Sequence, residues 1–242
     1  MNTITLSTAN AKTDKNNVLL LPLSSPLKLE DNLISLTHCN MYYNWKNFKA
    51  EYGNTAFEYT SHRTKLTYKV RIPDGSYSVS DLNNFLHHDM QLNKLENADG
   101  TFDINVYENN VYNRITVTVT TDFTLHLSDG LMETLGFDST QKNVTGTEVN
   151  GNLVPHLERV NTVVIHCNLV HNRVTRDSSV LYTFTPNQRF GSLLTVKPYF
   201  QESCFCRNAE FNEIEITFTD QTGRDLDVED VILVRIGITE AK

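Results

Sequence analysis

The stretch "RITVTVTT", residues 114–121, gives the clearest indication of local structure in this chain. Ile115, Val117 and Val119 alternate with threonines. In an extended strand the apolar side chains therefore share one face and the threonines the other. This alternation is typical of a β-strand that covers a core on one side and meets water on the other.

The same period of two recurs in "VVIHCNLV" (163–170), "EIEITFTD" (213–220) and "VILVRIGI" (231–238). Turn residues separate these segments. Strands are expected at residues 18–23, 33–43, 65–72, 101–108, 113–120, 162–170, 181–185, 193–200, 213–219 and 231–238. Many short strands at such spacing predict an all-β sandwich or barrel.

Two short helices interrupt the strands. Ser80 is the expected N-cap of the first, in which Leu82 and Leu86 recur at helical spacing. Ser128 is the expected N-cap of the second, which ends at Gly136. We expect the first helix to cover a sheet and close one end of the sandwich, and the second to carry Leu131 and Leu135 on one face.

The domain organisation predicted from the sequence is simple. Residues 1–16 are rich in Thr, Asn and Lys and suggest a flexible N-terminal arm. No repeat or composition break follows, so residues 17–242 are expected to form a single domain, in which 143–152 is a long surface loop.

The composition limits the possible partners. A chain of 242 residues with 39% hydrophobic residues can bury a substantial core, and its net charge of −8 argues against direct nucleic-acid binding by the body of the domain and against an anionic membrane. No apolar run reaches the length of a membrane span, and the N-terminus lacks a signal-peptide pattern. Four cysteines without a spaced framework favour a reduced, intracellular origin rather than secretion.

Few residues suggest chemistry. His87 and His88 are adjacent on a helix and so point about 100° apart, too far to ligate one metal together. Cys204 and Cys206 do not form a Cys-x-x-Cys turn, and the acidic residues within 220–230 do not match a calcium loop. No nucleophile elbow or phosphate-binding glycine loop is present. We therefore expect no catalytic residue, no metal site and no cofactor.

Five segments in a fixed order carry a family resemblance. They are "LISLTHCNMYYNWKNF" (33–48), "IPDGSYSVSDLNNFL" (72–86), "LHLSDGLMETLGF" (125–137), "VVIHCNLVHNRVTRDSSVLYTF" (163–184) and "NEIEITFTDQTGRDLDVED" (212–230). Over about residues 18–240 the chain resembles the single jelly-roll minor capsid (penton) proteins of Polinton/Maverick-type elements, adintoviruses and virophages, and their uncharacterised relatives in animal genomes. Asn168 stands where many of those proteins have Asp, so a role that needs a carboxylate there would not transfer.

The resemblance implies a single jelly-roll sandwich of two antiparallel sheets, an all-β fold. It also implies a homopentamer at the fivefold vertices of an icosahedral shell, next to a double jelly-roll major capsid protein. Such a virion protein is assembled inside the host cell and needs no cofactor.

The residues expected to serve assembly are Trp45 and Asn47, at the end of a strand, and Asn187, Arg189 and Phe190, in the loop "NQRFG" (187–191). These are expectations about position, since a single sequence does not locate an interface.

Two other classes of function stay open at this point. A lectin-like or receptor-binding sandwich would expose Trp45, Tyr42 and Tyr43 on a ligand face. An enzyme on a β scaffold would need a cluster of titratable residues in a pocket.

Overall fold

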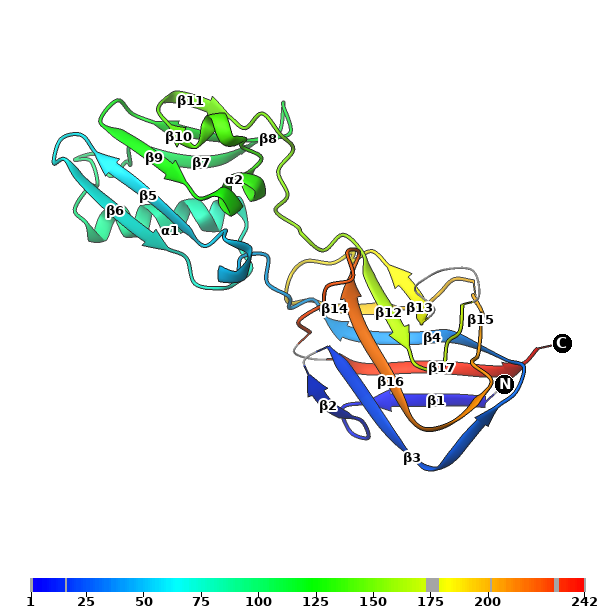
Figure 1. Ribbon diagram of the computed structural model, residues 1–242. Coiled ribbons are helices and arrows are strands. Elements are labelled where there is room, and N and C mark those ends of the chain that lie inside the picture. Colours follow the sequence, from blue (N-terminus) through cyan, green and yellow to red (C-terminus); the bar gives the residue numbers. More distant parts are fainter. Residues whose placement is uncertain (1, 16, 173–178, 201, 229–230, 242) are drawn as a thin grey trace. The chain divides into compact units, whose positions relative to one another are not determined.

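The chain forms two compact units (Figure 1). The structure is a computed structural model that describes residues 2–15, 17–172, 179–200, 202–228 and 231–241. Unit 1 consists of Met1–Trp45 and Val160–Lys242, and unit 2 of Lys46–Arg159. The sequence predicted one domain over 17–242, whereas unit 2 is inserted within the chain of unit 1. Both units are rich in strands, so no change of composition marks the boundaries.

Unit 1 contains two antiparallel sheets. Its described strands are β1 (Asn2–Ser7), β2 (Lys12–Lys15), β3 (Val18–Leu29), β4 (Asn32–Tyr42), β12 (Val163–Cys167), β13 (Val180–Phe184), β14 (Leu193–Val196), β15 (Cys204–Phe205), β16 (Ala209–Asp220) and β17 (Val231–Glu240). One sheet has the order β1-β17-β4-β14, with β15 also paired to β4. The other has the order β13-β12-β16-β3-β2.

The order of these strands is that of a jelly roll. Without the short β2 and β15, the first, eighth, third and sixth strands of unit 1 in chain order form one sheet. The second, seventh, fourth and fifth strands form the other. Two interlocking Greek keys of this kind define the jelly roll. The predicted jelly-roll sandwich of two antiparallel sheets is thus confirmed, and unit 2 enters the chain between its third strand (β4) and its fourth (β12).

The N-terminal segment differs from the flexible arm expected over residues 1–16. β1 pairs with β17, the last strand, along all six of its residues. Leu6 is fully buried in the core of unit 1, and β2 pairs with β3. Because the partner of β1 lies at the other end of the sequence, local composition did not reveal the pairing.

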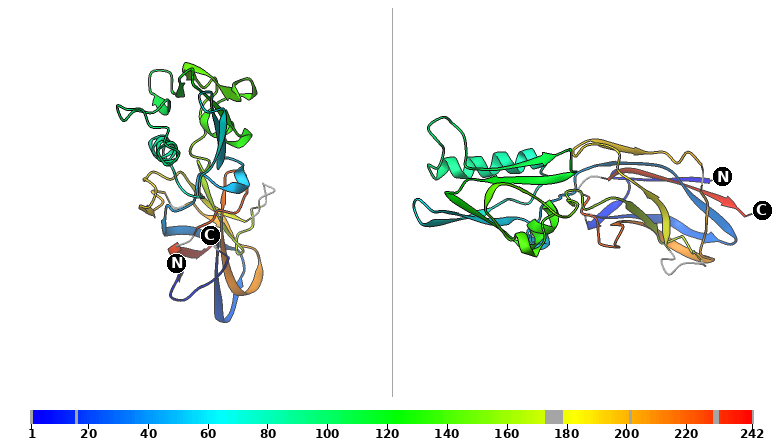
Figure 2. Two further views of the ribbon diagram at one scale, coloured as in Figure 1. Left: turned by 90° about the vertical axis from the view of Figure 1, so that its left-hand side faces the viewer. Right: turned by 90° about the horizontal axis from the view of Figure 1, so that it is seen from above.

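Unit 2 is a small α+β unit, and α1 is seen end-on beside its strands in the left view of Figure 2. Its described elements are the 3-10 helices Ala50–Tyr52 and Ser139–Gln141, the strands β5 (Ala56–Ser61), β6 (Leu66–Arg71), β7 (Ile104–Asn109), β8 (Arg114–Val119), β9 (Phe123–Leu127), β10 (Asn143–Val144) and β11 (Gly146–Asn150), and the helices α1 (Val79–Leu92) and α2 (Asp129–Leu135). The strands form two sheets, β10-β9-β5-β6 and β11-β8-β7.

The first helix starts two residues earlier than predicted. Ser78, not Ser80, is the N-cap: its hydroxyl accepts from the Asp81 N–H at 3.1 Å, and the Asp81 carboxylate accepts from the Ser78 N–H at 2.9 Å. This reciprocal capping box satisfies two of the free N–H groups at the helix start. Leu82 and Leu86 are buried as expected. The N-cap Ser128 and the C-cap Gly136 of α2 are confirmed.

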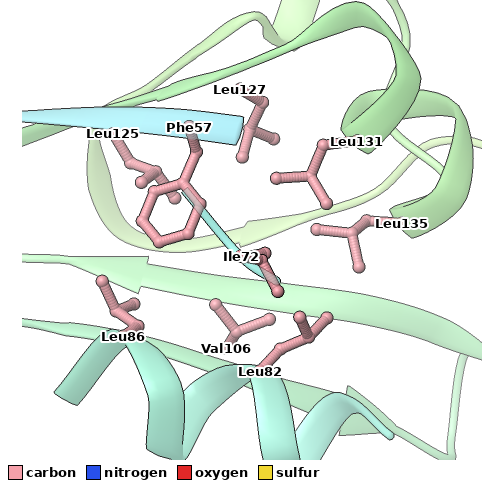
Figure 3. Close-up of a pocket in the computed structure, with 9 residues that line it drawn as sticks. All are labelled: Phe57, Ile72, Leu82, Leu86, Val106, Leu125, Leu127, Leu131 and Leu135. Carbon is pink, nitrogen blue, oxygen red and sulfur yellow. The ribbon is translucent and has the colours of Figure 1, made fainter. Parts of the chain in front are cut away.

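The core of unit 2 lies between its helices and sheets (Figure 3). An apolar cavity of about 30 Å³ is left where α1 and α2 meet the strands. Its lining side chains are all apolar and belong to Phe57, Ile72, Leu82, Leu86, Val106, Leu125, Leu127, Leu131 and Leu135. A space of this size and polarity is a packing defect of about one methylene group rather than a ligand site.

The segment 143–152, predicted to be a loop, contains β10 and β11. β11 pairs with β8, the strand on which the sequence pattern was clearest. Ile115, Val117 and Val119 of β8 are buried as predicted. Thr116 is also fully buried, and its hydroxyl donates to the side chain of Asn150. The alternation therefore predicted the strand correctly but not the covering of its other face.

Candidate assembly sites

Three aromatic rings at one end of the jelly roll connect two of the predicted positions. The Tyr43 ring lies 4.3 Å from the Trp45 ring and 6.1 Å, edge-on, from the Phe190 ring. Trp45 is 4% exposed and Tyr43 is 7% exposed, whereas Phe190 is 49% exposed. The cluster thus runs from the core of unit 1 to its surface. Of the three residues on which the lectin-like interpretation depended, Trp45 and Tyr43 are buried and Tyr42 is 39% exposed.

The loop that carries Asn187, Arg189 and Phe190 is fixed at its C-terminal end. The Gly191 N–H donates to the Tyr43 carbonyl at 2.6 Å, and the Tyr43 N–H donates to the Ser192 carbonyl at 2.9 Å. Asn187, Arg189 and Phe190 are all exposed. The loop therefore exposes an amide, a guanidinium and an aromatic ring at a position anchored to the end of β4.

Asn47 lies in unit 2 and is 5% exposed, so it cannot act as a surface contact. Its side chain donates to the Tyr77 carbonyl at 2.9 Å and accepts from the Tyr77 N–H at 2.9 Å. Phe48 and Gly75 continue this pairing as an isolated antiparallel bridge. Asn47 thus fastens the start of unit 2 to the turn that precedes α1.

A second exposed aromatic group was not predicted. Tyr199, Phe200 and Phe205, here called the aromatic segment, follow β14 and run onto β15 beside β4. Their exposed fractions are 92%, 77% and 54%, and the rings of Tyr199 and Phe200 meet edge-to-face at 4.9 Å. The sequence "KPYFQESCF" lacks alternation, and this absence was the signal that these aromatic residues do not face a core.

The paired histidines belong to the architecture of unit 2. His87 Nε2 donates to the Ile104 carbonyl at 3.1 Å, and the Val106 N–H donates to Asn83 Oδ1 at 2.8 Å. His87 and Asn83 of α1 thereby pair with backbone groups at the free edge of β7, which could otherwise pair with another strand. His88 is exposed on the helix. Across the described residues, no group of three or more His, Cys, Asp or Glu side chains is placed to hold a metal ion.

The cysteines are free thiols without catalytic character. Burial raises the pKa of Cys39 and of Cys167 to about 12, and that of Cys206 to about 11. Cys204 is half-buried, and burial raises its pKa as well. A nucleophilic cysteine needs the opposite shift, toward the thiolate.

In the acidic hairpin, the Asp220 carboxylate is held by hydrogen bonds within the turn. Asp220 Oδ1 accepts from the Thr222 N–H and hydroxyl, both at 2.7 Å, and from the Arg224 N–H at 3.1 Å. The carboxylate thus serves the turn between β16 and β17. Glu229 and Asp230 lie outside the described residues, as do residues 173–178 of the fourth resemblance segment. In the part of the chain that the structure describes, no helix has the length and hydropathy of a membrane span.

Comparison with known proteins finds a likeness in structure only. The sequence matches no protein-family model and no curated protein. The structure is similar to the crystal structure of selenomethionine-labelled mavirus penton protein, with a TM-score of 0.52 and 12% sequence identity. The match covers 100% of this chain and 98% of that chain, so it includes unit 2 as well as the jelly roll. At 12% identity the likeness establishes the fold alone, a jelly roll with an inserted unit that this chain shares with the mavirus penton protein.

Proposed function

We propose that this chain is a structural minor capsid protein that forms homopentamers at the fivefold vertices of an icosahedral shell. Its second partner in this role is a double jelly-roll major capsid protein. The chain is then part of a virion, is assembled inside the host cell and performs no catalysis.

The observation that carries this proposal is the full-length structural likeness to a penton protein. A jelly roll with an unrelated insertion would match only over unit 1, whereas this match extends over both units. The order of the five sequence segments supports the same function independently of the structure.

A closed ring of identical subunits uses two different surfaces of each subunit. We assign the aromatic segment to one of them. At about 200 Å² for each aromatic side chain, its exposed fractions amount to about 450 Å² of apolar surface. This is more than half of the roughly 800 Å² that each partner buries in a standard interface. The exposed loop residues Asn187, Arg189 and Phe190 are proposed as polar and aromatic contacts, and the buried Trp45 and Asn47 as residues that hold their own units in shape.

The assembly state can be measured by size-exclusion chromatography with light scattering and by native mass spectrometry. We expect a species of five 27.6 kDa chains, or a monomer that becomes pentameric on co-expression with a double jelly-roll major capsid protein. The double substitution Tyr199→Ser and Phe200→Ser should convert the pentamer to monomer, because it removes the largest exposed anchors of the proposed interface.

The matched control is the double substitution Val111→Ser and Tyr112→Ser, which removes an exposed pair of adjacent apolar side chains from unit 2. This variant should assemble like the wild type. A stable dimer that does not join capsid assemblies would contradict the function. A pentamer that persists in the variant with Tyr199→Ser and Phe200→Ser would contradict the assigned surface but not the function.

A further inference from the structure

A row of hydrogen-bonded side chains crosses the outer face of the four-stranded sheet in unit 2, whose strands β5, β6, β9 and β10 are labelled in Figure 1. Each strand contributes one residue: Thr67 from β6, Thr60 from β5, His126 from β9 and Asn143 from β10. The distances are 2.9 Å from Thr67 Oγ1 to Thr60 Oγ1, 3.1 Å from Thr60 Oγ1 to His126 Nε2, and 2.8 Å from His126 Nδ1 to Asn143 Oδ1. Phe57, the neighbour of this row on β5, points to the core instead.

This row has a direction. Asn143 Oδ1 can only accept, so His126 Nδ1 donates to it, and in the neutral imidazole Nε2 then accepts from the Thr60 hydroxyl. The Thr60 oxygen in turn accepts from the Thr67 hydroxyl. The amide N–H₂ of Asn143 is then a donor at one end of the row, and the Thr67 oxygen is an acceptor at the other. Both groups are exposed and are held in place by the bonds between them.

The row lies in a groove with a volume of about 410 Å³, within the range of small-ligand sites. The charged side chains at its margin are paired: Lys142 Nζ lies 3.0 Å from Asp129 Oδ1, and Lys69 Nζ lies 3.3 Å from Glu58 Oε1. The groove is therefore polar but close to neutral. A solvent-facing side of an antiparallel sheet is ordinarily polar. The hollow and the fixed row of hydrogen bonds distinguish this face.

We propose that this groove binds a neutral saccharide. A sugar hydroxyl both donates and accepts, so it can use the Asn143 amide and the Thr67 oxygen alike. An anionic ligand would require an unpaired cation, and the lysine that lines the groove faces a carboxylate. A nucleobase would require an exposed aromatic face, and the ring among the lining residues, Phe57, is buried. This inference goes beyond the capsid role and does not depend on it.

The test is an array of immobilised neutral oligosaccharides of glucose, galactose, mannose and N-acetylglucosamine, probed with the full chain. We expect binding to at least one of them, followed by titration calorimetry with that oligosaccharide in solution. Thr67→Val and Asn143→Ala should each weaken binding by roughly three- to tenfold, the effect of one lost neutral hydrogen bond. Both side chains are exposed on strands, and wild-type circular dichroism and melting temperature would show that each variant is folded.

Thr195→Val is the matched control, because it removes the hydroxyl of an exposed strand threonine in unit 1. It should leave the affinity unchanged. Failure to bind any neutral oligosaccharide would overturn the proposal, as would preference for sulfated or sialylated glycans added to the same array. Binding that survives both groove substitutions would overturn the assigned site.

Discussion

Asn47→Ala should destabilise unit 2 selectively. The substitution removes two hydrogen bonds of 2.9 Å that join the side chain to the N–H and the carbonyl of Tyr77. Each bond contributes about 1 kcal/mol, and each backbone group left without a partner costs about 1–3 kcal/mol when fully buried. Tyr77 is only half-buried, so water can reach part of the site. We therefore expect a loss of about 2–4 kcal/mol in the free energy of unfolding.

Urea denaturation with two probes separates the units. The helices α1 and α2 both lie in unit 2, so ellipticity at 222 nm follows that unit. Trp45, the one tryptophan of the chain, is buried in the core of unit 1, so its fluorescence follows the jelly roll. The ellipticity midpoint of Asn47→Ala should fall, while the fluorescence midpoint should stay where it is in the wild type.

Asn84→Ala is the control. Asn84 is exposed on α1, where removal of an asparagine should change stability by less than about 0.5 kcal/mol. An Asn47→Ala variant as stable as this control would refute the role given to the two bonds. An equal shift of both transitions would refute the assignment of Asn47 to unit 2 alone.

Three further predictions follow from local geometry. Gly136→Ala should lower the free energy of unfolding by about 3 kcal/mol and Gly223→Ala by only about 1 kcal/mol, measured by thermal or urea denaturation. Both glycines have φ near +80°, but only a Cβ on Gly136 would meet backbone, at 2.5 Å. Equal losses in the two variants would contradict this close approach. Burial raises the pKa of Cys39 from 9.0 to about 12, so the free energy of unfolding should fall as the pH rises above about 9. In the folded chain at pH 8, a thiol reagent should label Cys204 well before Cys39. Labelling of Cys39 first would contradict its burial. Val106→Ile should raise the free energy of unfolding by about 0.7 kcal/mol, because its extra methylene would fill the 30 Å³ cavity at about 24 cal/mol per Å³. A lower free energy of unfolding would show that the cavity cannot accept the methylene.

The sequence predicted those features that depend on neighbouring residues. Alternation on β8 and helical spacing around Leu82 and Leu86 are local patterns, and the structure confirms the strand and the buried helix face. β1 was missed because its partner β17 lies at the far end of the chain. The insertion of unit 2 was missed because it follows from which strands pair, and residues on either side of Trp45 look alike in composition.

For the candidate sites, too, the sequence identified single residues but not the long-range contacts between them. Trp45 and Phe190 were predicted from sequence separately, and Tyr43 brings them together through ring contacts that no spacing rule would predict. Asn47 was expected at an assembly position at the end of a strand, whereas it is buried and its side chain forms two bonds to Tyr77. The aromatic segment has no periodic pattern, and exposure is a property of the fold rather than of the residue.

The separate cores of the two units give a physical reason to test assembly and saccharide binding independently. Among the described residues, the buried cluster of unit 1 and that of unit 2 have no residue in common. The aromatic segment belongs to unit 1, and the polar row from Thr67 to Asn143 belongs to unit 2. A substitution on either surface leaves the core beneath the other one intact. The double substitution Tyr199→Ser and Phe200→Ser should therefore abolish the pentamer, while the resulting monomer keeps its saccharide affinity. Thr67→Val should weaken saccharide binding in a chain that still assembles. Loss of saccharide affinity in the variant with Tyr199→Ser and Phe200→Ser would mean that the groove is formed or completed by assembly, and the saccharide site would then have to be sought between subunits.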